Sequence, residues 1–320
     1  MRWIKLEQVA KKILEALMNG LKPEHGDFSS SSLARARTLL RKLGCIAGEG
    51  DYITPGVNFD LCLRLFGLKS DEQGELREVR LLLSDIHLGR KTETFNLGVL
   101  RIRIRKLIAE LSSLTSGGAR LLVFGLGDYV DGAGIYGRQA YEQEIDPSDQ
   151  VVEFTNVFAE LFEMADSVYA VIGNHGRTDE NESASFDYIA LKSALSGKRN
   201  AYVSKRYVDV FNVGGEQVLL GHVSHVRAYH GIPDYGIRRF LYSQLARWRG
   251  LGEAYLGHFH VFKYSSEPVA WVSNGTFLDN DELSYRMGFT CDVGQAVVLI
   301  EDNKKWTGFI NLGGAGVADR

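Results

Sequence analysis

Five short apolar runs in this chain end in the same way, with side chains that bind metal ions or move protons. Each run has the length of a buried strand, and carboxylate, amide or imidazole groups follow it directly. The runs and their ends read LLLSDIH, LLVFGLGDYVDG, YAVIGNH, VLLGHVSH and AYLGHFH. Because ligands gather outside the carboxyl ends of strands in an α/β sheet, the pattern predicts one site built from five segments. Six of the eight histidines lie in these segments, which packing alone does not explain.

The order of strand and helix patterns beyond residue 79 predicts an α/β fold. Strand patterns in VRLLLSD, ARLLVFGLGD and SVYAVIGN alternate with helical patterns at residues 93–114 and in PSDQVVEFTNVFAELFEMA. This alternation indicates a sheet with both faces covered. After residue 200 the strand patterns follow one another more closely, which predicts a second, more antiparallel sheet. Its expected strands are 207–213, 217–221, 253–257, 269–273, 295–301 and 305–312.

The first 70 residues have a different pattern, which predicts helices and a hairpin. Apolar residues recur at helical spacing in VAKKILEAL, and SSSSLARARTLLRKLG offers serine caps before a second helix. CIAGEGDYIT then reads as two short strands around a turn. Helices followed by a hairpin are typical of a winged-helix module, and a small helical cap on the main domain explains the pattern equally well. In the winged-helix interpretation, the residues expected to meet phosphates are Arg35, Arg37, Arg41 and Lys42.

The polar stretch KSDEQGELREV indicates a linker between two domains. We therefore expect a small accessory domain at residues 1–70, a linker at 71–78 and the main domain at 79–320. Residues 1–70 hold 11 Lys and Arg against 7 Asp and Glu, a balance of +4, so a total of −3 leaves −7 for the remainder. A basic accessory domain weakly favours a polyanionic partner, although a solvated helix surface explains the charge as well.

Cysteine usage and hydropathy bear on the location of the protein. Cys45, Cys62 and Cys291 are odd in number and widely spaced, which predicts no disulfide framework and no cysteine zinc site. No apolar run reaches the ~18 residues of a membrane-spanning helix, and the first residues lack the pattern of a signal peptide. We expect a reducing, cytoplasmic location and no membrane partner.

The residue types at the strand ends indicate the chemistry. Carboxylate, amide and imidazole groups without a thiolate suit Mn, Fe, Zn, Ni or Co. Asp128 is a natural bridge, because a carboxylate has two oxygens for two cations. Two metals ~3.5–4 Å apart hold a hydroxide nucleophile and neutralise the attacking and leaving oxygens of a phosphate ester. We expect two divalent transition-metal ions, with Mn²⁺ preferred.

The ordered series DxH, GDxxD, GNH, GH and GHxH resembles the motifs of the calcineurin-like metallophosphoesterase superfamily, over residues 79–312. The resemblance implies a four-layer α-β-β-α sandwich of two mixed sheets with a dinuclear metal centre. It implies that the first metal is held by Asp85, His87, Asp128 and His260, and the second by Asp128, Asn174, His222 and His258. It also implies that His175 protonates the leaving-group oxygen and that Asp131 orients and charges His175.

Two glycines depart from the pattern of the protein Ser/Thr phosphatases, which read GDxVDRG and GNHE. Gly132 replaces the arginine that clamps a phosphomonoester dianion, which argues against a protein phosphatase. Gly176 replaces the glutamate, and it also departs from the GNHD that is more frequent in nucleases of the superfamily. The glycine at position 176 removes no metal ligand, but it leaves open which neighbouring residues hold the metal ligands in position.

Two longer stretches narrow the resemblance. GDYVDGAGIYGRQAYEQEIDPSDQVVEF is similar to the small, exonuclease-type subunit of archaeal DNA polymerase D and to phosphoesterases encoded by phages. WVSNGTFLDNDELSYRMGFTCDVGQAVVLI resembles the phage proteins in its N-G-[ST] step and its later glutamine. DNA-repair nucleases of the SbcD type share the motif series.

We therefore predict a metal-dependent phosphodiesterase, foremost a DNA exonuclease or endonuclease. A small-molecule phosphodiesterase or nucleotide phosphatase is the alternative, favoured slightly by the acidic main domain, and a catalytically silent nucleic-acid-binding subunit is a third. Nucleic acid is the expected partner, and a homodimer is left open. Candidate phosphate contacts are Arg90, Arg138 and Arg177, candidate base-stacking residues are Tyr129, Tyr136 and Tyr229, and candidate channel residues are His225 and His230. For each of these, an ordinary loop residue is the simpler interpretation.

Overall fold

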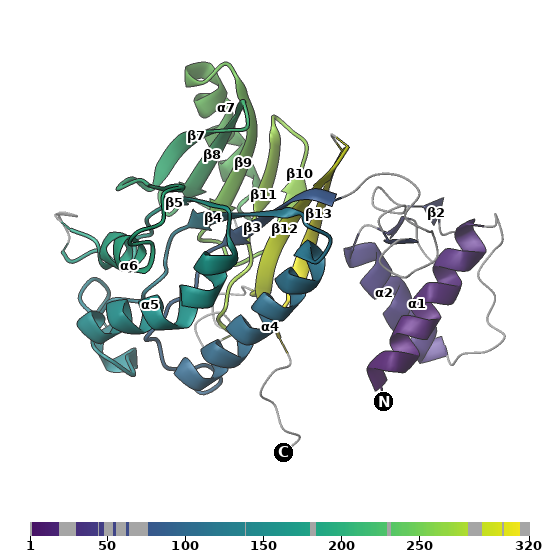
Figure 1. Cartoon of the computed structure of the whole chain (residues 1–320), viewed down its shortest axis with the longest axis horizontal. Helices are drawn as coiled ribbons and strands as arrows, with labels where there is room; N and C mark the ends of the chain where they lie inside the picture. Colours follow the sequence, from purple (N-terminus) through teal and green to yellow (C-terminus); the bar gives the residue numbers. More distant parts are fainter. Residues whose placement is uncertain are drawn as a thin grey trace. The chain divides into compact units, whose positions relative to one another are not determined.

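The chain divides into two units, residues 1–77 with 299–308 and residues 78–298 with 309–320 (Figure 1). The structure is a computed structural model, and the residues that it describes are 2–18, 30–43, 45–47, 54–55, 62–63, 76–137, 139–179, 184–228, 232–280, 290–302 and 304–313. The predicted domain boundaries, 1–70, 71–78 and 79–320, stay predictions.

The first unit contains the predicted helices. Helix α1 (Arg2–Met18) and helix α2 (Ser30–Lys42) precede β1 (Ile46–Ala47) and β2 (Thr54–Pro55), which pair antiparallel. The two helices pack through buried apolar side chains that include Ile13 and Leu14 of α1 and Leu33 and Leu40 of α2. Much of the predicted hairpin lies outside the described residues, so the winged-helix interpretation and its phosphate contacts stay predictions.

Two of the three cysteines form a disulfide within this unit. Cys45 and Cys62 are bonded, with their Cα atoms 5.7 Å apart, and both are buried in the same apolar cluster as the helices. The prediction that no disulfide forms was wrong, because spacing along the chain does not report which cysteines the packing brings together. The disulfide also removes the cysteine argument for a reducing, cytoplasmic location, which stays a prediction. Cys291 is free.

Membrane-spanning character is absent from the described helices, none of which is both long and apolar enough to cross a bilayer.

The first sheet has six strands in the order β13-β12-β3-β4-β5-β6. Its parallel part joins β3 (Leu76–Leu83), β4 (Arg120–Leu126), β5 (Ser167–Val171) and β6 (Ala201–Val203). The last two strands of the chain, β12 (Gly294–Glu301) and β13 (Lys304–Asn311), extend this sheet beyond β3. Both had been predicted in the second sheet. An alternating pattern reveals a strand but not its neighbour, so this assignment was wrong.

Helices α4 (Leu97–Thr115), α5 (Pro147–Met164) and α6 (Phe186–Ala194) connect the parallel strands. Each begins at a capping side chain that accepts backbone hydrogen bonds from the first turn. These caps are Asn96 for α4, Asp146 for α5 and Ser185 for α6. A short 3₁₀ helix, η1 (Gln139–Glu142), lies between β4 and α5.

The second sheet has five strands in the order β10-β11-β9-β8-β7. Its strands are β7 (Val208–Val213), β8 (Glu216–His222), β9 (Leu251–Gly257), β10 (Lys263–Ser265) and β11 (Ala270–Ser273). The central pairs, β8 with β9 and β9 with β11, are parallel, whereas β7 and β10 join antiparallel at the edges. The sheet is therefore mixed rather than mainly antiparallel.

The two sheets pack face to face, because β4 contacts β8 and β9 while β5 contacts β7 and β8. Helix α7 (Asp234–Arg247) covers the second sheet through Ile237 and Leu241, which pack with Leu219 and Trp271. Figure 1 shows α4, α5 and α6 on one side of the two sheets and α7 on the other. The predicted four-layer α-β-β-α sandwich is confirmed.

The disulfide leads to a simple prediction. Chain denatured without reductant should show one reactive thiol, that of Cys291, and three after reduction, as a thiol-reactive dye would count. The Cys291→Ser variant is the control and should show none before reduction. Three thiols in unreduced parent protein would contradict the Cys45–Cys62 bond.

Candidate metal centre

The nine predicted site residues lie among the described residues, at or just beyond the carboxyl ends of five strands. Asp85 and His87 follow β3, Asp128 and Asp131 follow β4, Asn174 and His175 follow β5, His222 ends β8, and His258 and His260 follow β9. Since the two sheets pack face to face, segments from both sheets reach the same edge. The sequence pattern thus corresponds to one cluster in space.

The backbone of this cluster is unusual. Asp85, His87, Asp128, His258 and His260 have φ angles of 52°, 48°, 54°, 96° and 58°. Within the described ranges, Asp302 is the only other non-glycine residue with positive φ. This left-handed conformation costs on the order of 1–3 kcal/mol per residue and persists only where the surroundings hold it. Its concentration at the predicted ligands indicates a functional site.

Hydrogen bonds between loops hold this backbone in place. The amide of His87 donates to the carbonyl of Asp128 at 3.1 Å, and the amide of Asp131 donates back to Leu88 at 3.0 Å. The amide of His258 donates to both carboxylate oxygens of Asp85, at 3.1 Å each. The loops after β3, β4 and β9 therefore support one another.

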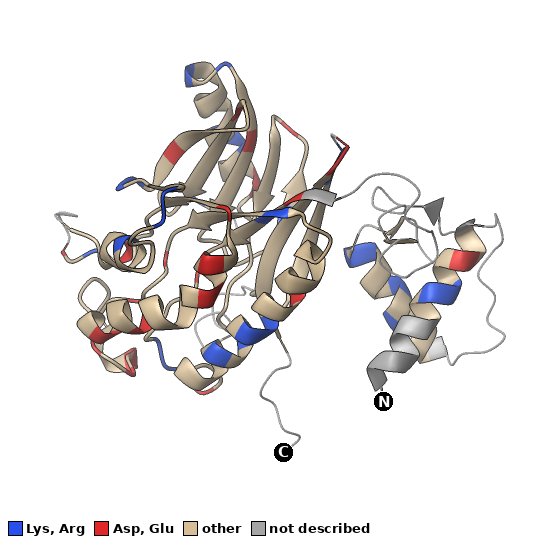
Figure 2. Cartoon of the chain, viewed as in Figure 1, with Lys and Arg blue, Asp and Glu red and all other residues tan. Residues whose placement is uncertain are grey.

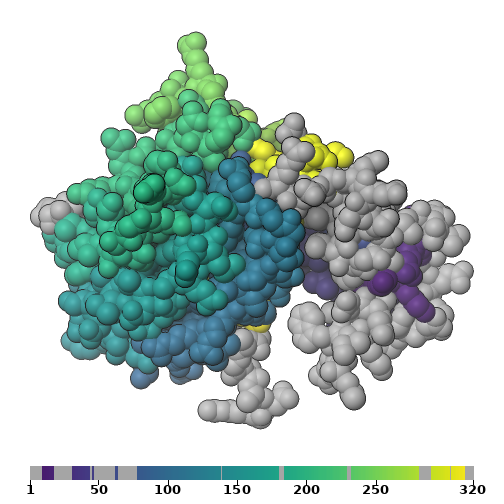
Figure 3. All heavy atoms as spheres, in the orientation of Figure 1, coloured from purple at the N-terminus to yellow at the C-terminus, as the bar shows by residue number. Residues whose placement is uncertain are grey.

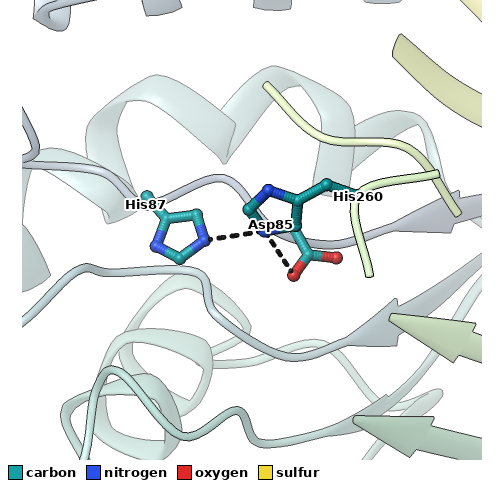
Figure 4. Close-up of side chains that lie close together, drawn as sticks. All are labelled: Asp85, His87 and His260. Carbon is teal, nitrogen blue, oxygen red and sulfur yellow. Dashed lines mark hydrogen bonds and ion pairs between the residues drawn. The ribbon is translucent and has the colours of Figure 1, made fainter. Parts of the chain in front are cut away.

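One group of candidate ligands consists of Asp85, His87 and His260 (Figure 4). One ligand atom from each lies within 4.8 Å of those of the other two. The Nε2 atoms of His87 and His260 are 3.3 Å apart, and His260 Nε2 is 3.3 Å from Asp85 Oδ1. Figure 4 shows the His260 ring between the other two side chains.

A second group consists of Asp128, His222 and His258, whose ligand atoms also lie within 4.8 Å of one another. His222 Nε2 is 3.1 Å from Asp128 Oδ2 and 2.7 Å from Asn174 Oδ1. Tyr136 Oη lies 2.6 Å from Asn174 Nδ2, which leaves the amide oxygen facing His222.

Asp128 belongs to the second group and also forms a third with His87 and His175, whose ligand atoms lie within 4.8 Å of one another. Its Oδ2 atom is 3.1 Å from His222 Nε2 in the second group and 3.9 Å from His87 Nε2 in the first. Its Oδ1 atom accepts a hydrogen bond from the His175 amide at 2.9 Å. This is the position that the sequence predicts for a bridging carboxylate.

The charges in the cluster compensate one another. Burial lowers the pKa of His260, but the Asp85 carboxylate outweighs it and raises this pKa to about 10. In the same way Asp128 raises the pKa of His222 to about 9 against the effect of burial. Burial and the charge of His222 lower the pKa of His258 to about 3. The buried carboxylates of Asp85 and Asp128 thus favour positive charge beside them, one in each ligand group. Carboxylate and imidazole groups in this arrangement are suitable ligands for divalent metal ions.

The pair of His175 and Asp131 lies beside the second group. Asp131 Oδ1 is 2.8 Å from Nδ1 of His175 and 2.8 Å from Nδ1 of His87. Burial lowers the pKa of His175, but the Asp128 and Asp131 carboxylates outweigh it and raise this pKa. The His175 side chain is 19% exposed while Asp131 is completely buried. An imidazolium that solvent reaches and a buried carboxylate orients has the properties of a proton donor.

Sequence reasoning missed the glutamines that surround Asp131. Gln143 Nε2 donates to Asp131 Oδ2 at 2.5 Å, and Gln139 Nε2 donates to the Asp131 carbonyl. Gln150 accepts from the Gly132 amide at 2.8 Å and donates to Gln143 at 2.8 Å. The stretch GDYVDGAGIYGRQAYEQEIDPSDQVVEF contains these residues, but their spacing alone does not indicate that they converge.

The later N-G-T step and the glutamine also have a structural role that the sequence did not show. Thr276 Oγ1 donates to the Asp85 carbonyl at 2.8 Å. Asn274 Nδ2 donates to Ser84 Oγ at 3.0 Å, and this hydroxyl donates to Asp85 Oδ2 at 2.6 Å. Gln295 accepts from the Ser84 amide at 2.9 Å. The two ends of the main domain therefore meet behind Asp85.

The candidate phosphate-contact and base-stacking residues differ in their distance from the site. Arg90 Nη1 lies 3.9 Å from Asp131 Oδ1. The Tyr136 ring is 4.9 Å from that of His175, and the Arg177 guanidinium is 5.9 Å from the Tyr136 ring centre. These three residues border the site. Arg138, Tyr229 and His230 lie outside the described residues.

Tyr129, one of the candidates for stacking on bases, is not accessible to a base, and it is not the ordinary loop residue of the simpler interpretation either. It is completely buried, its hydroxyl donates to the Val171 carbonyl at 2.9 Å, and its ring packs against Phe154. The turn after β4 directs it into the core. His225 is exposed, with its ring 5.3 Å from that of Phe240 on α7, and it belongs to neither ligand group.

Comparison with solved structures finds only distant similarity. A dimetal phosphatase from Danio rerio is 12% identical, with 74% of this chain and 97% of that chain covered and a TM-score of 0.42. Vacuolar Protein Sorting 29 from Cryptosporidium parvum is 13% identical, with 74% and 98% covered and a TM-score of 0.39. Similarities this low carry no argument about activity. No curated protein matches the sequence significantly.

Comparison of the sequence with models of protein families identifies the family of the chain. The sequence model of the calcineurin-like phosphoesterases matches residues 80–274, which is more than half of the chain and contains all five motifs. Phosphoesterases of this family bind divalent metals, in agreement with the two ligand groups. The finer resemblance to phage, polymerase D and SbcD-type proteins stays a prediction. From the match and the motifs together, the chain belongs to the calcineurin-like phosphoesterase family.

Proposed function

We propose that the chain is a two-metal phosphodiesterase that cleaves DNA, as an exonuclease or an endonuclease. The observation that carries this proposal is the pair of ligand groups that Asp128 joins, with His175 and Asp131 beside them. A binding subunit without activity has no need of this pair, and no predicted ligand is missing from the chain.

The proposed ligands follow the two groups. Asp85, His87, Asp128 and His260 would hold one ion, and Asp128, Asn174, His222 and His258 the other, with Mn²⁺ as the preferred metal. When bound, two such ions activate water and neutralise charge on the phosphate oxygens.

The protein itself supplies the proton. His175 donates it to the leaving oxygen, and Asp131 holds the Nδ1 side of the ring so that the opposite nitrogen faces the substrate. The neighbouring carboxylates raise the pKa of His175 against the effect of burial, which favours the imidazolium needed for this step. Gln143 in turn fixes the second oxygen of Asp131.

The border of the site favours a diester in a polymer. Gly132 stands where a phosphomonoesterase carries its clamping arginine. Arg177 lies over the face of Tyr136, which is 44% exposed and adjacent to His175. A cation and an exposed ring beside the proton donor suit a phosphate and a base of single-stranded nucleic acid.

The exposed side of α7 adds support. Tyr235 and Tyr242 are 63% and 64% exposed, and Arg238, Arg239 and Arg247 are exposed on the same helix. Asp234, the one acidic residue of α7, is paired with Lys263. Figure 2 shows the charges on the ribbon, and the α7 segment projects at the top of Figure 3. Arginines interleaved with aromatic rings are suited to a nucleic-acid backbone and its bases.

A small-molecule phosphodiesterase or nucleotide phosphatase is the second candidate. It is favoured by the acidic balance of residues 71–320, −7 from a total of −3 and +4 for residues 1–70. Contact of residues 1–70 with nucleic acid, a cytoplasmic location and a homodimer remain proposals.

The nuclease assignment is tested with end-labelled single- and double-stranded DNA and Mn²⁺, with Asp128→Ala as the control. We expect ladders or mononucleotides from the parent protein alone, and their pattern distinguishes endonuclease from exonuclease activity. Intact DNA together with hydrolysis of bis-p-nitrophenyl phosphate would instead identify a small-molecule enzyme.

The metal assignment predicts a loss of metal in defined variants. Asp128→Ala should lose most of its Mn²⁺, because both ions share this carboxylate, and His258→Ala should lose about one ion per chain. The amount of metal is measured by mass spectrometry after gel filtration. His225→Ala, three residues after His222 but outside both ligand groups, is the matched control and should keep the parent content. Full metal content in Asp128→Ala would exclude the bridging role.

The role of His175 predicts a dependence on the leaving group. His175→Ala should keep its metals but hydrolyse esters with poor leaving groups ~10²–10⁴-fold more slowly, because these need the proton. Nitrophenyl esters should be affected far less. Equal slowing of both classes, measured as kcat, would argue against proton donation.

A further inference from the structure

Asp187 is a completely buried carboxylate behind the candidate metal centre. It lies in the first turn of α6, and both of its oxygens accept backbone hydrogen bonds. Oδ2 accepts from the amides of Asp128 at 3.0 Å and Gly173 at 2.7 Å. Oδ1 accepts from the amides of Tyr129 at 3.0 Å and Val130 at 3.1 Å. One side chain thus joins the loop after β4 to the loop after β5.

These two loops carry Asp128 and Asn174. Buried amides without partners are unfavourable, and these four amides all donate to a single carboxylate. Asp128 is also held in the left-handed conformation, with φ 54°, which the chain does not adopt without support. Asp187 therefore fixes the backbone from which both candidate ligands extend.

Gly176 explains why this carboxylate comes from α6. Its φ is outside the left-handed region, so its backbone conformation does not require glycine. A Cβ atom at position 176 would instead lie 2.8 Å from Asp187 Oδ1, closer than such atoms approach, and 3.0 Å from both the Cγ and the backbone nitrogen of Asp187, which is tighter than usual. The Asp187 carboxylate occupies the space that a side chain at position 176 would enter.

The two segments are also tied together along the backbone. The amide of Phe186 donates to the Gly176 carbonyl at 2.6 Å, and the amide of Thr178 donates to Ala184 at 3.0 Å. The start of α6 is therefore held against the GNHG loop. This contact brings Asp187 next to position 176, where the related motifs GNHD and GNHE carry an acid.

We infer that Asp187 is a positioning residue that supplies, from α6, the carboxylate missing from the GNHG motif at position 176. It acts through the backbone of Asp128 and of the Gly173–Asn174 loop, and it contacts neither of the two ligand groups through their ligand atoms. The glycine and the aspartate form a complementary pair, in which each requires the other.

A swap of the carboxylate tests this pair. The variants are Asp187→Ala, the milder Asp187→Asn, and Asp187→Ala combined with Gly176→Asp. Asp166→Ala is the matched control, because Asp166 Oδ2 also accepts a buried-strand amide, that of Leu121 at 2.7 Å, at the opposite end of β4. Mn²⁺ affinity is measured by calorimetry on the full chain, and amide hydrogen exchange is measured on the metal-free chain.

We expect Asp187→Ala to bind Mn²⁺ about 10–100-fold more weakly, and to exchange the amides of residues 128–130 and 173 faster than the parent. Asp187→Asn should show a smaller loss, because one acceptor oxygen remains. The double variant should recover protection and most of the affinity. Asp166→Ala should lower the melting temperature without changing either readout at the site.

Two results would overturn the inference. One is parent-like Mn²⁺ affinity and amide protection in folded Asp187→Ala or Asp187→Asn, which would reduce Asp187 to a general structural residue. The other is a folded double variant that is no better than Asp187→Ala, which would show that position 176 and position 187 do not exchange their carboxylate.

Discussion

The Asp128 carboxylate is the point on which the rest of this site depends. It is almost completely buried, and its oxygens face His222, His87 and the amide of His175. A buried charge of this kind needs positive partners close by. The imidazole of His222, whose pKa Asp128 raises to about 9 against the effect of burial, provides one from β8, so the two sheets must meet at this edge for the carboxylate to be tolerated.

Close approach of the strand ends makes this arrangement possible. A Cβ atom at Gly173 would lie 2.1 Å from the Asp128 nitrogen, so the loops after β4 and β5 touch only because glycine is there. Around these loops, the side chains of Asp187, Gln143 and Asn274 form hydrogen bonds with polar groups that lie next to the candidate ligands. The ligands are thus held by strained backbone, and the strain is offset by buried hydrogen bonds of the scaffold.

The sequence predicted the parts of this picture that have a local signature. Apolar runs that end in Asp, Asn or His revealed the strands and their common edge, because a strand end followed by such side chains is recognisable in the sequence. The nine predicted site residues converge at this edge, and their roles stay predictions. The sequence did not reveal Asp187 or Gln143, whose roles depend on which loops lie beside them. The Cys45–Cys62 bond, the place of β12 in the first sheet and the inward turn of Tyr129 were missed for the same reason, since each is set by packing between distant segments.

We propose that Asp128 lies between two metal ions, and anomalous X-ray diffraction from crystals of the Mn²⁺-loaded chain would locate them. We expect two peaks ~3.5–4 Å apart, one beside Asp85 and His260 and the other beside His222 and His258, with Asp128 in contact with both. A single peak, or two peaks of which neither contacts Asp128, would contradict it.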